Sequence, residues 1–291
     1  MTQTTQDTPE ELMAAAEGGD FIAIQQALEL AYETSDHGLL QRANAAFAAS
    51  DPRVRVHSDG SVLVEVADAR DPDTLEPGRE LFPTFLMGQH PVTNRQFLAF
   101  VEDTEYDASH GIGDLLEHWA DGAPSDDVLD HPVVHVSMLD AIAYCEWAGL
   151  TLPSEAMWEL AAVGPTGTPY PWGDSPTPNS AYTHIMSRTT ASVGTYRTTR
   201  TAYGCQDMLG NVSEWCLTYD DYDGDAPTGP LGPRLERLDQ SDPYELSKRL
   251  MAVRGSAYMR RGVKLMFCQH SRALRAGRRN HWVGFRVALR T

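Results

Sequence analysis

The sequence predicts an α+β domain with a small helical appendage at its N-terminus. Residues 1–50 are rich in alanine and carry apolar residues at helical spacing, whereas turns dominate beyond residue 165. Residues 254–290 have strand-like ends that frame a basic, aromatic-bearing middle (residues 259–282) with no helical or strand period. Such a middle segment specifies a core poorly and is well suited to presenting side chains to a partner.

The first predicted elements are short helices followed by a hairpin. Residues 8–49 predict two or three helices, and the sequence TPEE at residues 8–11 is a capping box with proline at the first helical position. Residues 53–66 alternate around an Asp-Gly pair at 59–60, which is a strong hairpin signal. We therefore expect three parts: a helical appendage (1–50), a hairpin and linker (51–81), and a main domain (82–291).

The main domain begins with three predicted helices and one strand-like stretch. Thr93 or Asn94 is expected to cap the first helix, and the strand-like stretch covers residues 131–136. Residues 138–148 predict a second helix that ends at the glycine after them, and Ser154 is the expected cap of the third. The turns that follow residue 165 predict loops held in place by specific interactions.

The charge distribution is uneven. The chain holds 23 Lys and Arg against 41 Asp and Glu, a net charge of −18. Residues 247–291 contain 12 of the bases and no acid, so residues 1–246 hold 11 bases and all 41 acids, a net of −30. The basic end either pairs internally with the acidic body or forms a site for an anionic partner. The acidic total argues against a general nucleic-acid binder.

Cysteine usage and hydropathy limit the class of protein. The four cysteines lie far apart without a CxxC pair, so they predict neither a zinc site nor a disulfide framework. No run of about 18 apolar residues occurs, and the N-terminal residues lack the basic start and apolar core of a secretory signal. We therefore expect no membrane span and a reducing, cytoplasmic location, with export by another route left open.

Six sequence blocks occur in a recognisable order. They read VTNRQFLAFV, HPVVHVSMLDAIAYCEWAGLTLPSEAMWELAA, YPWGD, YGCQDMLGNVSEW, RGSAY and VGFRVAL. Together they resemble the formylglycine-generating enzyme (sulfatase-modifying factor) family over residues 82–290. The resemblance implies a C-type-lectin-like fold of the formylglycine-generating-enzyme subtype, with a small twisted sheet, flanking helices and long ordered loops. Family members include copper-dependent oxidases, iron-dependent sulfoxide synthases and the non-catalytic variable proteins of diversity-generating retroelements.

The residues argue against the oxidase chemistry. The family oxidase needs two cysteines after its GGSW-like block, because thiolates are the soft ligands that hold Cu(I). The matching positions here are Arg260 and Leu265, and Ala257 and Ser213 replace two further family residues. Cys268 is the one thiol nearby, and we interpret it as a small buried apolar residue. No copper is therefore expected.

A divergent metal-dependent oxidase or sulfoxide synthase is the alternative enzyme hypothesis. Its residues would include His131 and His135, which share one face of the expected strand and could begin a metal site. The competing interpretation is that these histidines make structural hydrogen bonds. Neither a GxSxG motif nor a phosphate-binding glycine loop is present.

The resemblance also implies a structural calcium ion. In the family, the turn before the GNxxEW tryptophan binds calcium through oxygen atoms, the donors that calcium requires. Carried onto this chain, the ligands are the side chains of Asp207 and Glu214 and the carbonyl oxygens of Gly210 and Val212. The competing interpretation is that Glu214 pairs with an arginine such as Arg286 and binds no ion.

The hypothesis that best joins these observations is a non-catalytic ligand-binding protein. In the variable-protein relatives, diversified residues lie between the GGSW-like and GFR blocks, which here is the window 259–282. The partner is expected to be a protein or other macromolecule bound through this window, and the sequence leaves the ligand and the oligomeric state open. The candidate ligand-binding residues are Arg260, Arg261, Val263, Leu265, Phe267, His270, Leu274 and His281.

Overall fold

The computed structural model shows two compact units, residues 1–64 and residues 65–291. Each unit is described by itself below. The part of the chain that the structure describes comprises residues 8–34, 36–69, 81–106, 111, 116, 117, 119, 122–174, 184–196, 200–217, 242–259 and 267–291.

The first unit contains the expected helices. They are α1 (Pro9–Glu17), α2 (Phe21–Thr34) and α3 (His37–Ser50), and they pack on one another through a core that includes Met13, Ile24 and Phe47. Thr8 caps α1 in a complete capping box, with its side chain accepting from Glu11 N–H. The prediction of two or three short helices is thus confirmed.

The predicted hairpin is present as β1 (Val54–Val56) and β2 (Val62–Val66), which pair antiparallel. Its loop is held by Asp59, whose carboxylate accepts hydrogen bonds from the N–H and hydroxyl of Ser61 at 2.9 and 2.8 Å. Gly60 adopts φ 84°, a conformation that glycine reaches without steric cost. The boundary between the two units falls within β2.

The three predicted helices of the second unit begin where the sequence predicts. Thr93 and Ser137 form capping boxes, and Ser154 accepts from Met157 N–H at the third helix. Gly149 ends the second helix in the left-handed conformation. They are α4 (Asn94–Thr104), α5 (Met138–Ala148) and α6 (Glu155–Val163), whereas a 3-10 turn η2 (Asp126–Val128) and the helix α8 (Pro243–Lys248) were not predicted.

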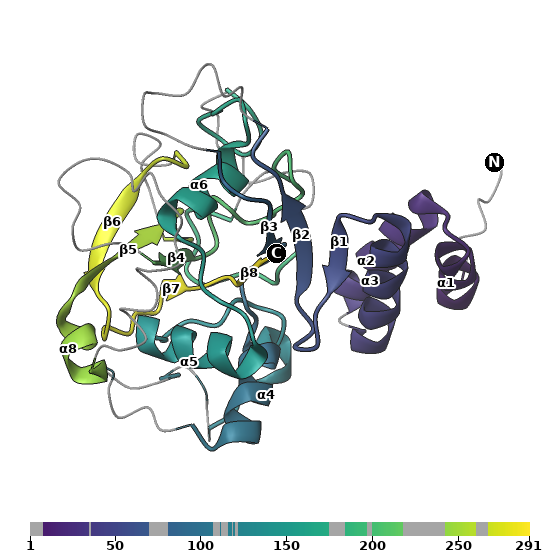
Figure 1. The fold of residues 1–291 in the computed structure, drawn as a ribbon. Helices are drawn as coiled ribbons and strands as arrows, with labels where there is room; N and C mark the ends of the chain where they lie inside the picture. Colours follow the sequence, from purple (N-terminus) through teal and green to yellow (C-terminus); the bar gives the residue numbers. More distant parts are fainter. Residues whose placement is uncertain are drawn as a thin grey trace. The chain divides into compact units, whose positions relative to one another are not determined.

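Short strands complete the second unit. β3 (Phe85–Gly88) pairs antiparallel with β8 (Ala288–Arg290). A four-stranded sheet has the order β6-β5-β4-β7, in which β4 and β7 are parallel and the other pairs are antiparallel (Figure 1). Its strands are β4 (Ser213–Cys216), β5 (Leu250–Arg254), β6 (Ser271–Arg275) and β7 (Val283–Gly284).

An aromatic core joins α4 and α5 to the GFR block. Phe97 stacks on Tyr144 with ring centroids 5.8 Å apart, and Phe285 meets Tyr144 edge-on at 5.4 Å. All three side chains are fully buried. This core confirms an α+β architecture in which the helical blocks and the terminal block pack together. In the described part of the chain, no helix has the length and apolar character needed to cross a membrane.

Two local predictions were wrong. Residues 131–136 do not form a strand: one isolated bridge occurs at Pro132, and His135 turns into the left-handed region at φ 57°. The window 259–282 was expected to lack a strand, yet Ser271–Arg275 forms β6. Both errors have one cause, since contacts with distant segments set these conformations: His135 N–H donates to the Asn280 carbonyl, and β6 is held by β5.

Candidate functional site

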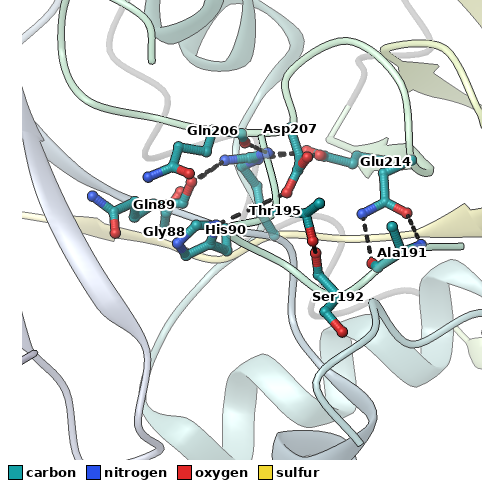
Figure 2. A network of polar contacts seen from close by, with 11 residues as sticks. Gly88, Gln89, His90, Ala191, Ser192, Thr195, Gln206, Asp207 and Glu214 are labelled. Atoms are coloured by element: carbon teal, nitrogen blue, oxygen red, sulfur yellow. Dashed lines mark hydrogen bonds and ion pairs between the residues drawn. The ribbon is translucent and has the colours of Figure 1, made fainter. Parts of the chain in front are cut away.

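The centre of the β4–β7 region holds a fully buried ion pair between Glu214 and Arg286; Figure 2 shows Glu214 and its surroundings. Arg286 donates from Nε to Oε2 at 2.6 Å and from Nη2 to Oε1 at 2.8 Å. Trp158 Nε1 also donates to Oε2, and Arg286 reaches the carbonyls of Gly88 and Gln206. Burial alone would lower the pKa of Arg286, but the Glu214 carboxylate outweighs it and the pKa is raised. Arg286 therefore keeps its positive charge.

The residues predicted to bind calcium lie around this ion pair. Both carboxylate oxygens of Glu214 accept hydrogen bonds, so the competing interpretation of an arginine pair describes the observed geometry. Asp207 is buried at φ 55°, and its Oδ2 receives no hydrogen bond from a described residue. That oxygen lies 3.9 Å from His90 Nδ1, and burial lowers the pKa of His90. Gly210 and Val212 are buried on the turn between the two carboxylates.

The cysteines offer no reactive thiol. All four are free and buried. Burial raises the pKa of Cys205 to about 11, and it raises the pKa values of Cys216 and Cys268 well above their ordinary value. The interpretation of Cys268 as a small buried residue is confirmed, since its side chain is inaccessible. The thiols of Cys205, Cys216 and Cys268 are therefore protonated near neutral pH.

The eight predicted ligand-binding residues do not form one described cluster. Of those that are described, Leu274 is half-buried on β6, whereas His281 is exposed in the turn before β7. Phe267 and His270 lie together, with ring centroids 5.8 Å apart in an edge-on arrangement. The other four lie outside the described residues: Arg260, Arg261, Val263 and Leu265.

Phe267 belongs to an aromatic cluster that sequence reasoning missed. It packs against the buried residues Tyr170, Ile185 and Leu209, and Trp172 packs there as well. Tyr170 and Trp172 stack with centroids 5.3 Å apart. The signal for this cluster was the YPWGD block, whose two aromatic residues stand in a turn-rich stretch without a helix or strand to bury them.

Two exposed methionines lie on segments beside this cluster. Met186 is 66% exposed and Met259 is 41% exposed. Their segments are joined, because Ser187 N–H donates to the Tyr258 carbonyl at 2.9 Å. Met186 directly follows Ile185, a member of the aromatic cluster. An apolar, partly aromatic surface therefore adjoins the beginning of the predicted binding window.

The histidine pair proposed for a metal site is separated. His131 Nδ1 lies 2.9 Å from Thr190 Oγ1, whereas His135 Nδ1 lies 3.3 Å from Glu117 Oε2. The ring of His135 instead neighbours that of His281, with centroids 6.1 Å apart. Within the described ranges, no three His, Cys, Asp or Glu side chains are arranged to hold a metal ion.

Several arginines of the basic end pair with the acidic body, as one of the two interpretations of the charge asymmetry predicts. Arg254 meets Glu155 and Glu159 of α6 at 3.1 and 2.5 Å. Arg279 meets Asp140 of α5 at 2.8 Å, with both side chains buried. These arginines, like Arg286, serve the framework rather than a surface.

Other arginines of the same stretch lie outside such ion pairs in the part of the chain that the structure describes. Arg272 lies over the ring of Trp282, 5.7 Å from its centroid. Arg275 and Arg278 are exposed, and no described acidic residue forms an ion pair with any of these three arginines. The basic end therefore contains both framework arginines and surface arginines.

The helices, the short sheets and the long connections define a domain of the C-type-lectin-like, formylglycine-generating-enzyme type. The model of the sulfatase-modifying factor enzyme 1-like domain matches residues 41–291. The chain therefore belongs to the sulfatase-modifying factor family, and the resemblance seen in the six sequence blocks is confirmed.

Curated relatives carry different activities. The formylglycine-generating enzyme of Thermomonospora curvata is 34% identical over 222 residues, which cover 60% of this chain and 71% of the relative. The serine/threonine-protein kinase Pkn1 of Chlamydia trachomatis is 37% identical over 165 residues, 52% of this chain and 26% of the kinase. The hercynine oxygenase of Mycobacterium tuberculosis is 33% identical, over 46% of this chain and 37% of the oxygenase. The chain thus spans a minor part of the last two.

Solved structures share the fold. PvdO from Pseudomonas aeruginosa has a TM-score of 0.57 at 21% identity, covering 82% of this chain and 98% of that chain. Treponema denticola variable protein 1 has a TM-score of 0.57 at 20% identity, covering 83% of this chain and 100% of that chain. At these identities the likeness shows the fold and carries no activity with it.

Proposed function

We propose that this chain is a non-catalytic ligand-binding protein that displays a C-terminal surface on the formylglycine-generating-enzyme fold. One observation carries the proposal: the family's two cysteine positions hold Arg260 and Leu265, and every cysteine of the chain is buried. Copper oxidase chemistry needs an accessible thiolate pair. A complete framework without that pair supports binding as the retained property.

The surface that we assign to binding combines the window 259–282 with the apolar residues beside it. Trp172, Met186, Met259 and Phe267 give it aromatic and methionine side chains, which are enriched at protein interfaces. Its partner in this proposal is a protein or other macromolecule.

We propose further that the window 259–282 is diversified, as in the variable proteins of retroelements. This proposal is supported by the fold that the chain shares with Treponema denticola variable protein 1; the likeness concerns the fold alone. Deep sequencing of the codons for 254–290 across a natural population tests it. Substitutions confined to the window, inside an invariant RGSAY and GFR frame, are the expected result. A uniform window would overturn diversification and leave a fixed binding site.

Binding itself is tested with peptides selected from a random display library on the wild-type protein. The double variant His270→Ala, His281→Ala should lose the selected peptides and keep its unfolding free energy within about 0.5 kcal/mol, because His281 is exposed and His270 is partly exposed. The matched control is Arg55→Ala, an exposed change in the first unit that should leave binding intact. Unchanged binding by the double variant would contradict the proposed surface.

The calcium ion remains a proposal. Asp207 Oδ2 supports it, because a buried carboxylate oxygen without a hydrogen bond is a ready ligand, while Arg286 already occupies Glu214. Calcium should raise the melting temperature of chelator-treated protein, and Asp207→Ala should remove that shift. An absent shift in the wild type would mean that Arg286 alone balances Glu214.

A divergent enzyme is the competing function, because formylglycine-generating enzymes and hercynine oxygenases are among the relatives. Elemental analysis of the purified protein separates the two functions. Stoichiometric iron or copper, together with oxygen consumption that depends on it, would replace the binding proposal.

A further inference from the structure

We infer that β6 binds an extended acidic peptide by adding it as a further strand. This inference rests on the proposed function and names the class of its ligand. β6 (Ser271–Arg275) stands at one end of the order β6-β5-β4-β7, and no described residue pairs with its outer edge (Figure 1). A strand in that position is a template for an incoming strand.

The hydrogen-bond pattern shows which backbone groups face outward. Ala276 N–H donates to the Arg249 carbonyl at 2.8 Å, in register with the β5–β6 ladder. Inward and outward residues alternate along an antiparallel strand, so Ser271 and Ala273 direct their N–H and C=O groups away from β5. Both residues are exposed, and no described backbone group bonds to theirs. The small side chain of Ala273 also leaves room for a neighbouring chain.

The charge beside this edge selects the ligand. Arg272, Arg275 and Arg278 are partly or fully exposed, and among described residues none of them has an acidic partner. Glu155 lies beside Ser271 but is engaged by Arg254. The screening length is about 8 Å at physiological ionic strength, so these nearby arginines outweigh the distant negative charge of the body. A peptide with acidic side chains on both faces complements them.

A second copy of this chain fits the edge poorly. Edge-to-edge pairing of two β6 strands would place the arginines of both copies along one strand pair, and like charges close together across such a pair are destabilising. The charge therefore favours a different, acidic chain over self-association.

The test uses a fluorescent ten-residue peptide in which pairs of Glu alternate with pairs of Thr, so that both faces of the extended peptide carry acids. The control peptide has Lys in place of each Glu. Three variants of the full chain are compared with the wild type. Arg275→Glu reverses charge at the edge, and Arg55→Glu makes the same charge change on β1 in the first unit. Ala273→Pro removes an outward N–H and spares the β5 ladder. Anisotropy reports affinity, and hydrogen exchange reports protection of residues 271–275.

We expect the wild-type protein to bind the acidic peptide, and to bind the basic peptide at least about tenfold more weakly. We also expect the Arg275→Glu variant to bind the acidic peptide at least about tenfold more weakly than the wild type does. Ala273→Pro should abolish binding, Arg55→Glu should not change it, and the peptide should slow exchange at Ser271 and Ala273. Unchanged exchange there, or full binding by Arg275→Glu, would overturn strand addition. If library peptides still need His270 and His281, the proposed function stands while this inference fails. A dimer that the peptide does not dissociate and whose formation protects 271–275 would identify a second copy as the occupant.

Discussion

β4 and β6 belong to one sheet and have opposite surroundings. All four residues of β4 are buried, whereas the residues of β6 alternate between exposed and half-buried. β4 carries Glu214 in an ion pair, while β6 carries Arg272 and Arg275 without one in the described structure. The contrast teaches that the two strands differ in what they can support: the buried β4 holds the architecture, and the exposed β6 is the strand to which we propose that a ligand binds.

Removing the buried ion pair beside β4 should lower the stability of the protein more than any other change considered. Arg286→Met leaves the Glu214 carboxylate buried without its partner, so the free energy of unfolding should fall by about 3–5 kcal/mol. Chemical denaturation followed by circular dichroism measures it. The double variant Arg286→Met, Glu214→Leu should recover part of the loss because no buried charge remains. A single variant as stable as the wild type would mean that the centre does not depend on this pair.

The aromatic cluster around Phe267 should contribute less to stability than the Glu214–Arg286 ion pair and more than the edge strand β6. Phe267 is partly buried, so Phe267→Ala should lower the free energy of unfolding by about 2 kcal/mol, less than for a fully buried phenylalanine. Met186→Ala, at an exposed neighbouring position, is the matched control and should change it little. Thermal and urea unfolding give both values. Equal, negligible effects would mean that Phe267 does not support the cluster.

Acid should weaken the framework through its buried histidine. The pKa of His90 lies below 6.5 in the folded protein because burial disfavours the imidazolium, so below pH 6.5 the unfolded chain binds the extra proton first. Stability should therefore fall as the pH falls below about 6.5, the ordinary pKa of histidine in the unfolded chain.

The midpoints of urea unfolding, measured between pH 5.5 and 7.5, give the change of stability with pH. The pKa values of His131 and His135 are also lowered, so these residues contribute to the loss of stability in acid. His90→Gln should reduce the slope. A variant with the wild-type slope would assign the acid sensitivity to other groups.

The smallest change in stability is expected for a substitution on the edge strand β6. Arg275→Glu should change the unfolding free energy by less than about 0.5 kcal/mol, since its side chain is exposed and outside any described ion pair. The same denaturation assay checks it against Arg286→Met. A loss of several kcal/mol would erase the proposed division between centre and edge.

Local signals in the sequence predicted local structure well. Thr8, Thr93 and Ser154 cap helices as expected, because a cap depends on residues within one helical turn. The family blocks allowed the fold class to be predicted, and the burial of Cys268 followed from the tendency of a free cysteine to be buried like a small apolar residue.

Contacts between distant segments were not predictable in the same way. The parallel pairing of β4 with β7 joins Ser213 to Val283, and the sequence around either residue does not predict this pairing. β6 escaped notice because an edge strand buries neither face fully, so its sequence shows no apolar alternation. The arrangement of the candidate site depends on such pairings, which is why His135 neighbours His281 rather than His131.

The contacts of Arg286 also bear on the order of folding. It bonds to Gly88 across 198 residues and to Glu214 across 72, so the acid at the centre has no counter-charge until the last family block has been synthesised. Contacts of such long range are slow to form because distant parts of the chain must first meet. A nascent chain that lacks the GFR block would therefore expose the strands that flank Glu214, and it would be a natural client for chaperones until Arg286 arrives.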